Sequence, residues 1–154
     1  AYLGLGDVFV VLFFGLIATG VTHYVLVLHV GEDWLPAWLA GLAVGLVINN
    51  LLVVNNHRDA DEDAACGKRT LVARYGQKFG VALYFFGSFV ALGLCPLYEG
   101  GLLWTVWLLP VALCLGLLLN KAKSQKDYAK LLGRTATLVI AHSILAIAGI
   151  LFID

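Results

Sequence analysis

Acidic and basic side chains gather in one short stretch of an otherwise apolar sequence. Asp59 and Asp63 lie four positions apart, and Lys68 and Arg69 follow soon after them. Oxygen ligands suit a hard ion such as Mg²⁺, which keeps several waters and shares its coordination shell with substrate phosphates. The stretch therefore predicts a site for a magnesium-bound diphosphate, in which the carboxylates hold the metal and the cations hold the phosphates.

A polar stripe leads up to this stretch. On a helix that continues through Asp63, successive residues turn by about 100°, so that Asn49, Asn56 and the two aspartates fall within about 80° of one another. Arg58 and Asp61 point to the opposite side. We therefore expect the stripe to enter the bundle and Asp61 to stay outside the metal site. A plainer alternative is that residues 57–74 are a solvated, charge-balanced loop.

The elements that position these residues are membrane-spanning helices. Of 154 residues, 61% are hydrophobic and 13% charged, and the mean hydropathy is +0.91. A spanning helix needs about 20 mostly apolar residues, and five stretches qualify. We predict an all-α membrane protein, one transmembrane unit over residues 1–154. The predicted spans are residues 8–28, 35–54, 79–97, 102–119 and 135–153.

The charges predict how the chain crosses the membrane. All ten lysines and arginines lie in two connections, residues 57–78 and 120–134. The positive-inside rule places both connections on the cytoplasmic side of the inner (cytoplasmic) membrane. The short acidic connections at 31–33 and 99–101 then lie outside, as does the C-terminus. Because the net charge is zero, no excess of basic residues points to nucleic acid as a partner, and the lipid bilayer is the partner of most of the surface.

A few residues inside the spans are not simply apolar. Gly41 and Gly45 form a G-x-x-x-G pair, for which we expect close helix packing within the bundle rather than dimerisation. His23 and His142 are ionisable groups inside predicted spans, where a functional role is the default hypothesis. For both histidines we expect hydrogen bonds between helices instead.

Two segments carry a resemblance to a known family. Residues 55–71, N-N-H-R-D-A-D-E-D-A-A-C-G-K-R-T-L, resemble the second aspartate-rich motif of the UbiA superfamily of intramembrane prenyltransferases, N-x-x-R-D-x-x-x-D-x-x-x-G-K-x-T-L. Residues 2–15, Y-L-G-L-G-D-V-F-V-V-L-F-F-G, are similar to the fifth helix of one branch, the 1,4-dihydroxy-2-naphthoate polyprenyltransferases of menaquinone synthesis.

The resemblance implies that the chain corresponds to the second half of a nine-helix bundle. The first aspartate-rich motif of the family, N-D-x-x-D-x-x-x-D, belongs to the N-terminal half and is not found in this sequence. Since that motif supplies the other metal-binding carboxylates in the family, we expect this chain to be inactive alone and to need the N-terminal half as its partner.

The resemblance also implies a reaction and residue roles. The reaction is the Mg²⁺-dependent transfer of a polyprenyl group from polyprenyl diphosphate to 1,4-dihydroxy-2-naphthoate, with loss of CO₂ and diphosphate, giving demethylmenaquinone. The catalytic residues would be Asp59, Asp63 and Lys68, of which the two aspartates bind Mg²⁺. Lys68 binds the diphosphate, with Arg69, Arg58 and Asn56 as further diphosphate-binding candidates.

Other functions stay open at this point. The enzyme can use another aromatic acid, such as 4-hydroxybenzoate. The chain can also be a non-catalytic membrane subunit, or a transporter segment in which the acidic stripe carries a cation. A CDP-alcohol phosphatidyltransferase is disfavoured, because the D-G-x-x-A-R segment that it requires is not found in the sequence.

Overall fold

The computed structural model describes residues 4–27, 34–98 and 100–153. Five helices within these ranges are long and apolar enough to cross a membrane, which confirms the predicted all-α fold and the number of spans. The candidate spans are Gly6–Leu26, Leu35–Arg58, Gln77–Tyr98, Gly100–Lys121 and Gln125–Phe152.

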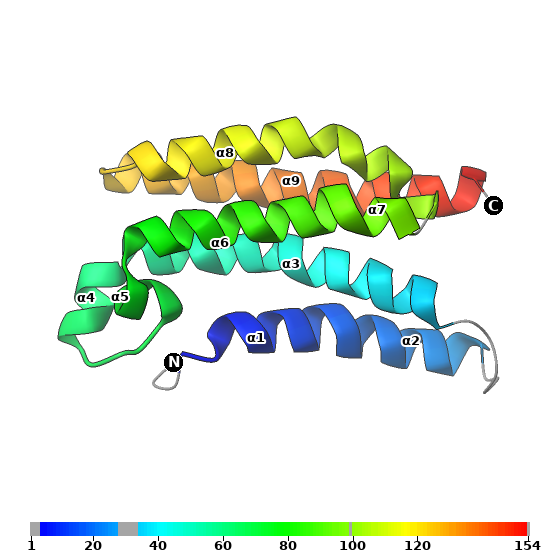
Figure 1. Cartoon of the computed structure of the whole chain (residues 1–154), viewed down its shortest axis with the longest axis horizontal. Coiled ribbons are helices and arrows are strands. Elements are labelled where there is room, and N and C mark those ends of the chain that lie inside the picture. The colour runs from blue at the N-terminus through cyan, green and yellow to red at the C-terminus, as the bar shows by residue number, and fades with distance from the viewer. Residues whose placement is uncertain (1–3, 28–33, 99, 154) are drawn as a thin grey trace.

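The first two spans pack side by side (Figure 1). The first consists of α1 (Gly6–Val10), the π-helical η1 (Val11–Ile17) and α2 (Ala18–Val27). The second is α3 (Leu35–Arg58), which also contacts the third and fifth spans and so lies at the centre of the bundle. Pro in its first turn suits a helix start, where the missing N–H has no partner to lose.

Glycines let these two spans approach closely. A Cβ atom added to Gly45 would lie 2.9 Å from the carbonyl oxygen of Val11, and one added to Gly15 would lie 2.5 Å from the carbonyl oxygen of Gly41. Any larger residue at these positions would force the helices apart. The pair Gly41 and Gly45 therefore packs within the chain, as predicted.

The remaining spans complete the bundle. The third consists of α6 (Gln77–Phe89), η2 (Val90–Leu94) and α7 (Cys95–Tyr98), and the fourth of η3 (Gly100–Leu108) and α8 (Leu109–Lys121). Buried side chains tie α6 to its neighbours. Asn50 Nδ2 of α3 donates to Ser88 Oγ at 3.0 Å, and the hydroxyls of Tyr84 and Thr135 lie 3.3 Å apart.

The fifth span, α9 (Gln125–Ile153), starts earlier than the predicted residue 135. Its start is fixed by a capping box, a reciprocal pair of side-chain hydrogen bonds to backbone N–H groups at a helix N-terminus. Asp127 N–H donates to Ser124 Oγ at 3.2 Å, and Ser124 N–H donates to the Asp127 carboxylate at 3.0 Å. The predicted basic connection is therefore mostly helical, because a helix continues past the apolar residues that span the membrane.

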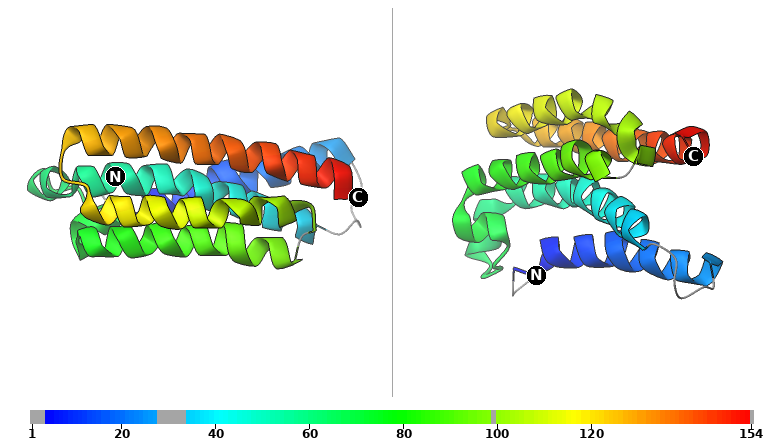
Figure 2. Two further views of the ribbon diagram at one scale, coloured as in Figure 1. Left: turned by 90° about the horizontal axis from the view of Figure 1, so that it is seen from above. Right: turned by 45° about the vertical axis from the view of Figure 1, so that its right-hand side comes forward.

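Both basic connections lie at one end of the bundle, which we call the basic end (Figures 1 and 2). It consists of residues 59–76, between α3 and α6, and residues 122–124, between α8 and α9. The far end carries the last turns of α2 and α9. The predicted acidic connection at 31–33, Glu99 and the C-terminal Asp154 lie outside the described residues.

The two histidines inside the spans do not form the predicted hydrogen bonds through Nε2. In both His23 and His142 this atom is buried without a hydrogen-bond partner in the described part of the chain. The ring of His23 instead lies edge-on to the ring of Trp34, with centroids 4.9 Å apart.

Candidate functional site

The acidic stretch begins where α3 ends. The unbroken helix through Asp63 that the polar stripe assumed is not present. Asp59 leaves helical geometry with φ −95° and ψ 8°, and α4 (Ala60–Ala65) starts after it. Aspartate favours helix ends, since its side chain competes for nearby hydrogen-bonding groups. The backbone N–H of Asp63 still donates to the carbonyl of Asp59 at 2.8 Å, so the two aspartates remain one turn apart.

Arg58 forms an ion pair with Asp59. Arg58 Nε lies 2.6 Å from Asp59 Oδ1, and Nη2 lies 2.8 Å from Oδ2, which is the two-pronged arrangement in which guanidinium binds carboxylate most strongly. The hydrogen bond from Arg58 holds the pKa of the Asp59 carboxyl below its usual value. The prediction that Arg58 points away from the aspartates is therefore wrong for Asp59, since its long side chain reaches back over the helix end.

Asp63 is paired with Lys68 across a tight turn. Lys68 Nζ lies 2.8 Å from Asp63 Oδ1, and the Lys68 backbone N–H donates to the Asp63 carbonyl at 2.9 Å. Gly67 closes the turn with φ +71°, a conformation that favours glycine. The Asp63 side chain is only 6% exposed whereas that of Lys68 is 44% exposed. The hydrogen bond to Asp63 raises the pKa of the Lys68 ammonium.

A complete metal site is not formed by the residues that the structure describes. They contain no group of three or more His, Cys, Asp and Glu side chains that could hold a metal ion. The two carboxylates carry oxygen donors of the type Mg²⁺ prefers, and each is balanced at present by a cation of the chain. Asp59 and Asp63 thus fit a part of a magnesium site, and their role as metal ligands stays a prediction.

Next to the turn at Gly67 lies a cavity of about 490 Å³, which we call the basic cavity. It is lined by three cationic side chains together with small residues, with no acidic residue in its described lining. The lining residues are Ala64, Gly67, Lys68, Arg69, Ala73 and Arg74. The cavity therefore brings together Lys68 and Arg69, as predicted, and adds Arg74, which the sequence reasoning missed.

Local structure explains why Arg74 reaches the basic cavity. It lies on α5 (Leu71–Tyr75), whose start is capped by Thr70 Oγ1 accepting from the Ala73 N–H at 3.1 Å. Because the chain changes direction at the start of this short helix, Arg69 before it and Arg74 on it both line the basic cavity. The sequence signal was a second arginine, five residues after Arg69.

The other two predicted diphosphate residues lie elsewhere. Arg58 lines a separate cavity of about 290 Å³ together with Asp61, Gln77 and Tyr128. Asn56 is buried in the last turns of α3. The structure thus groups Lys68 and Arg69, and does not group Arg58 with them.

A hydrogen-bonded contact fixes the helix end that carries the aspartates. His57 Nδ1 lies 3.0 Å from the Tyr128 hydroxyl on α9, and Gln77 Nε2 of α6 donates to the His57 carbonyl at 3.1 Å. His57 is 3% exposed. The last turn of α3 is therefore tied to two neighbouring helices, which limits the positions available to Asp59.

Deeper in the bundle lies a buried pair of polar residues, of which the sequence analysis identified Asn49 but not Asp7. Asn49 Nδ2 donates to Asp7 Oδ1 at 3.2 Å, and both residues are 5% exposed. Asn49 is buried as the polar stripe predicted. Asp7 was missed because the predicted first span begins at residue 8, whereas the helix begins at Gly6. The structure thus places an ionisable group inside a spanning helix, where it is a functional candidate by default.

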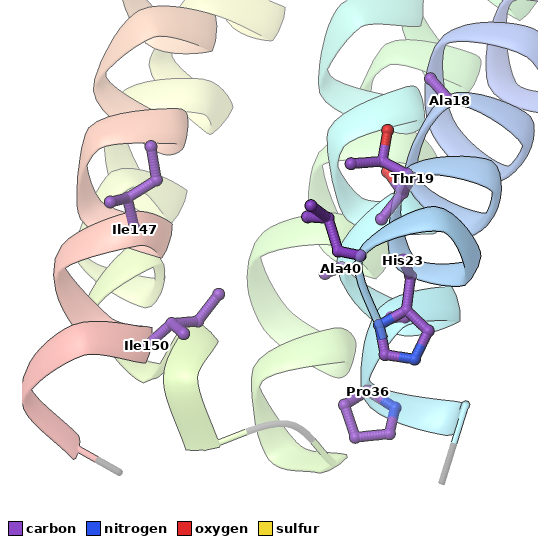
Figure 3. Close-up of a pocket in the computed structure, with 10 residues that line it drawn as sticks. Ala18, Thr19, His23, Pro36, Ala40, Ile147 and Ile150 are labelled. Atoms are coloured by element: carbon purple, nitrogen blue, oxygen red, sulfur yellow. The ribbon is translucent and has the colours of Figure 1, made fainter. Parts of the chain in front are cut away.

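A larger cavity of about 730 Å³ lies towards the far end, between α2, α3 and α9 (Figure 3). Its lining is mostly apolar and includes Ile147 and Ile150, with Thr19 and His23 among its polar groups. Such a space suits an apolar ligand rather than a charged one.

Comparisons with known proteins agree with this architecture. A model of the UbiA prenyltransferase family matches residues 1–138. No solved structure matches the chain.

Three curated relatives are each named 1,4-dihydroxy-2-naphthoate octaprenyltransferase. The Escherichia coli K12 relative is 36% identical over 115 residues, covering 72% of this chain and 36% of its own length. The Haemophilus influenzae Rd relative is 42% identical over 76 residues, covering 49% of this chain and 23% of its own. The Mycobacterium leprae relative is 40% identical over 83 residues, covering 54% of this chain and 27% of its own.

The chain thus spans between 23% and 36% of the length of these relatives. The family match, in contrast, covers most of the chain, including the acidic stretch and the basic cavity. The chain belongs to the UbiA prenyltransferase family.

Proposed function

We propose that this chain forms the second half of an intramembrane enzyme that transfers a polyprenyl group from polyprenyl diphosphate to 1,4-dihydroxy-2-naphthoate. The naphthoate ring carbon that carries the carboxylate forms a bond to the first carbon of the prenyl group. At the same time the bond between this prenyl carbon and the diphosphate oxygen breaks. The carboxylate then leaves as CO₂, and the electron pair of its bond restores the aromatic ring. The product is demethylmenaquinol, and demethylmenaquinone forms from it when an external two-electron oxidant acts after the transfer. The naphthoate acceptor is supported by the names of the three relatives.

The observation that carries the proposal is the buried Asp63 carboxylate paired with Lys68 at the edge of the basic cavity. We assign Asp59 and Asp63 to Mg²⁺, and Lys68 and Arg69 to the diphosphate. Bound Mg²⁺ would offset the negative charge that develops on the departing diphosphate. The Lys68 ammonium, 44% exposed, can turn from Asp63 to a phosphate oxygen without leaving water. Arg58 and Asn56 stay candidates for the same site.

The rest of the metal shell would come from the other half of the family fold. Two carboxylates and their waters leave room for further ligands, since Mg²⁺ takes six in an octahedral arrangement. The apolar cavity between α2, α3 and α9 can take part of the polyprenyl tail, because its lining matches a hydrocarbon chain.

For orientation, we propose that the basic end faces the cytoplasm of a cell with an inner membrane, as the positive-inside rule requires. Cys66 lies exposed at this end, whereas Cys95 is buried and Cys114 lies within a spanning helix. A charged, membrane-impermeant maleimide is expected to label Cys66 in inside-out vesicles and not in intact cells. A Cys66→Ser variant serves as the control for background labelling, and labelling of Cys66 from outside would refute the orientation.

The function is tested in membranes that contain this chain joined to the remainder of the family fold. Polyprenyl diphosphate is offered with either 1,4-dihydroxy-2-naphthoate or 4-hydroxybenzoate, with Mg²⁺ or with a chelator. The expected product is demethylmenaquinol, which is recovered as demethylmenaquinone after oxidation in air, and it should form with Mg²⁺ only. Transfer to 4-hydroxybenzoate alone would move the enzyme to another acceptor, and transfer to neither would favour a non-catalytic subunit or a cation pathway.

A further inference from the structure

The buried Asp7 and Asn49 pair lies at the wall of a cavity of about 360 Å³, which we call the Asp7 cavity. The cavity lies between the first span, α3, α5 and α6, and its other lining residues are apolar or glycine. Its volume is within the range of about 300–1,000 Å³ that small-molecule sites have. The combination of an apolar lining with a few polar groups is typical of a site that binds and orients a small ligand.

The hydrogen-bonding capacity of the pair is not used up. Asn49 Nδ2 donates to Asp7 Oδ1, which fixes the amide orientation, because a carboxylate offers acceptors. Asn49 Oδ1 is buried and has no hydrogen-bond partner in the described chain. A buried acceptor without a partner is unfavourable because it has lost its hydrogen bond to water, so the pair favours a ligand that brings a donor.

The position of the Asp7 cavity relates it to the diphosphate residues. Asn49 precedes Asp59 by ten residues of chain, which is about 15 Å along the axis at the usual helical rise. The helix α5 lies between the two cavities, since Leu71 lines the Asp7 cavity and Arg74 lines the basic cavity. A ligand in the Asp7 cavity would thus lie further into the bundle than a diphosphate at the basic end, with α5 between the two.

We propose that Asp7 and Asn49 bind a ring hydroxyl of the aromatic acceptor and so orient the ring towards the prenyl donor. The inference rests on the proposed function and adds the residues that hold its second substrate. The hydroxyl donates to the free Asn49 Oδ1 or to the Asp7 carboxylate, and the ring lies against the apolar lining.

Other parts of the substrates fit this place less well. A polyprenyl tail has no donor and would leave Asn49 Oδ1 unsatisfied. A diphosphate or the acceptor's own carboxylate would be repelled by Asp7, and the cations of the basic cavity serve such groups better. Of the groups on the two substrates, a ring hydroxyl of the aromatic acceptor is the one that can donate a hydrogen bond to either polar residue.

The test measures both substrates separately in the complete enzyme. In the Asn49→Leu and Asp7→Asn variants, the KM for 1,4-dihydroxy-2-naphthoate is expected to rise about tenfold, as for the loss of one hydrogen bond. The KM for polyprenyl diphosphate should stay within about twofold. Asn50→Leu is the matched control, because Asn50 is buried on the same helix but bonds to Ser88. It should change the amount of folded enzyme and neither KM.

A second measurement needs no variant. Each monomethyl ether of the acceptor is tested as a competitive inhibitor of the unaltered enzyme, and methylation of one of the two hydroxyls is expected to weaken binding about tenfold. Three results would overturn the inference and leave the proposed function intact. They are an unchanged KM for the aromatic acceptor in both variants, an equal rise in the KM values of both substrates, and equal binding of both ethers and the parent compound. An unaltered enzyme that prenylates no hydroxylated ring overturns both.

Discussion

Asp63→Asn in the complete enzyme is expected to lower magnesium-dependent prenyl transfer by on the order of 10³-fold. The substitution keeps the size of the side chain but removes the charge that would hold the metal. Because Lys68 is 44% exposed, loss of its partner leaves it in contact with water, and the protein should still fold. The measurement is the initial rate of prenyl transfer over a Mg²⁺ titration, alongside the thermal stability of the purified variant.

Asp61→Asn is the matched control for Asp63. Asp61 lies on the same short helix, but it is exposed and lines the separate cavity with Arg58. The control changes net charge by the same amount, so we expect its rate to stay within about twofold of the unaltered enzyme. Full activity of Asp63→Asn, or equal losses in both variants, would refute Asp63 as a metal ligand.

The second large effect is expected at the basic cavity. In a double variant, Arg69→Gln with Arg74→Gln, the KM for polyprenyl diphosphate should rise about 10²- to 10⁴-fold. Hydrogen bonds from charged donors contribute roughly 1.5–3 kcal/mol each, and two of the three cations that line the cavity are removed. The KM for the aromatic acceptor should change much less, so the ratio of the two KM values is the quantity to measure.

A control for net charge is available at the same end of the bundle. Lys78 and Lys126 are exposed and do not line the basic cavity. Replacing both by glutamine removes the same charge without touching the cavity, and the diphosphate KM should then rise only slightly. If the two double variants behave alike, the effect comes from the general field of the basic end, and the cavity has no specific role.

The fold was predictable because membrane helices follow from composition. Long apolar stretches leave few alternatives to a helix in a bilayer, and the five candidate spans match the predicted ones closely except at one start. The exception, α9, begins at Gln125 through the Ser124 and Asp127 capping box. Hydropathy reports where apolar residues end, and it does not report where a helix begins.

The site was predictable only in part. The turn at Gly67 and the grouping of Lys68 with Arg69 agree with the sequence interpretation. A helical projection could not show that α3 ends at Arg58, nor that a long arginine side chain bends back to Asp59. A helical projection gives only the direction in which each side chain leaves the helix axis. Whether two side chains touch also depends on how long they are.

Contacts between distant segments were beyond the sequence. Asp7 and Asn49 meet because the first span and α3 pack closely at their glycines, and nothing in either segment alone gives their register. The same holds for His57 and Tyr128, which are brought together by α3 and α9.

The pairing of Asp63 with Lys68 has a consequence for the order in which ligands arrive. If these residues act as proposed, a metal ion that binds alone must separate the pair and leave the ammonium without an anion. A metal that arrives with a diphosphate gives the ammonium a phosphate oxygen instead. Metal and diphosphate should therefore bind cooperatively, and each should raise the affinity for the other by the same factor. Calorimetric titration with Mg²⁺ would then show weak binding until the diphosphate is present, so that the prenyl donor itself controls when the enzyme is loaded with metal.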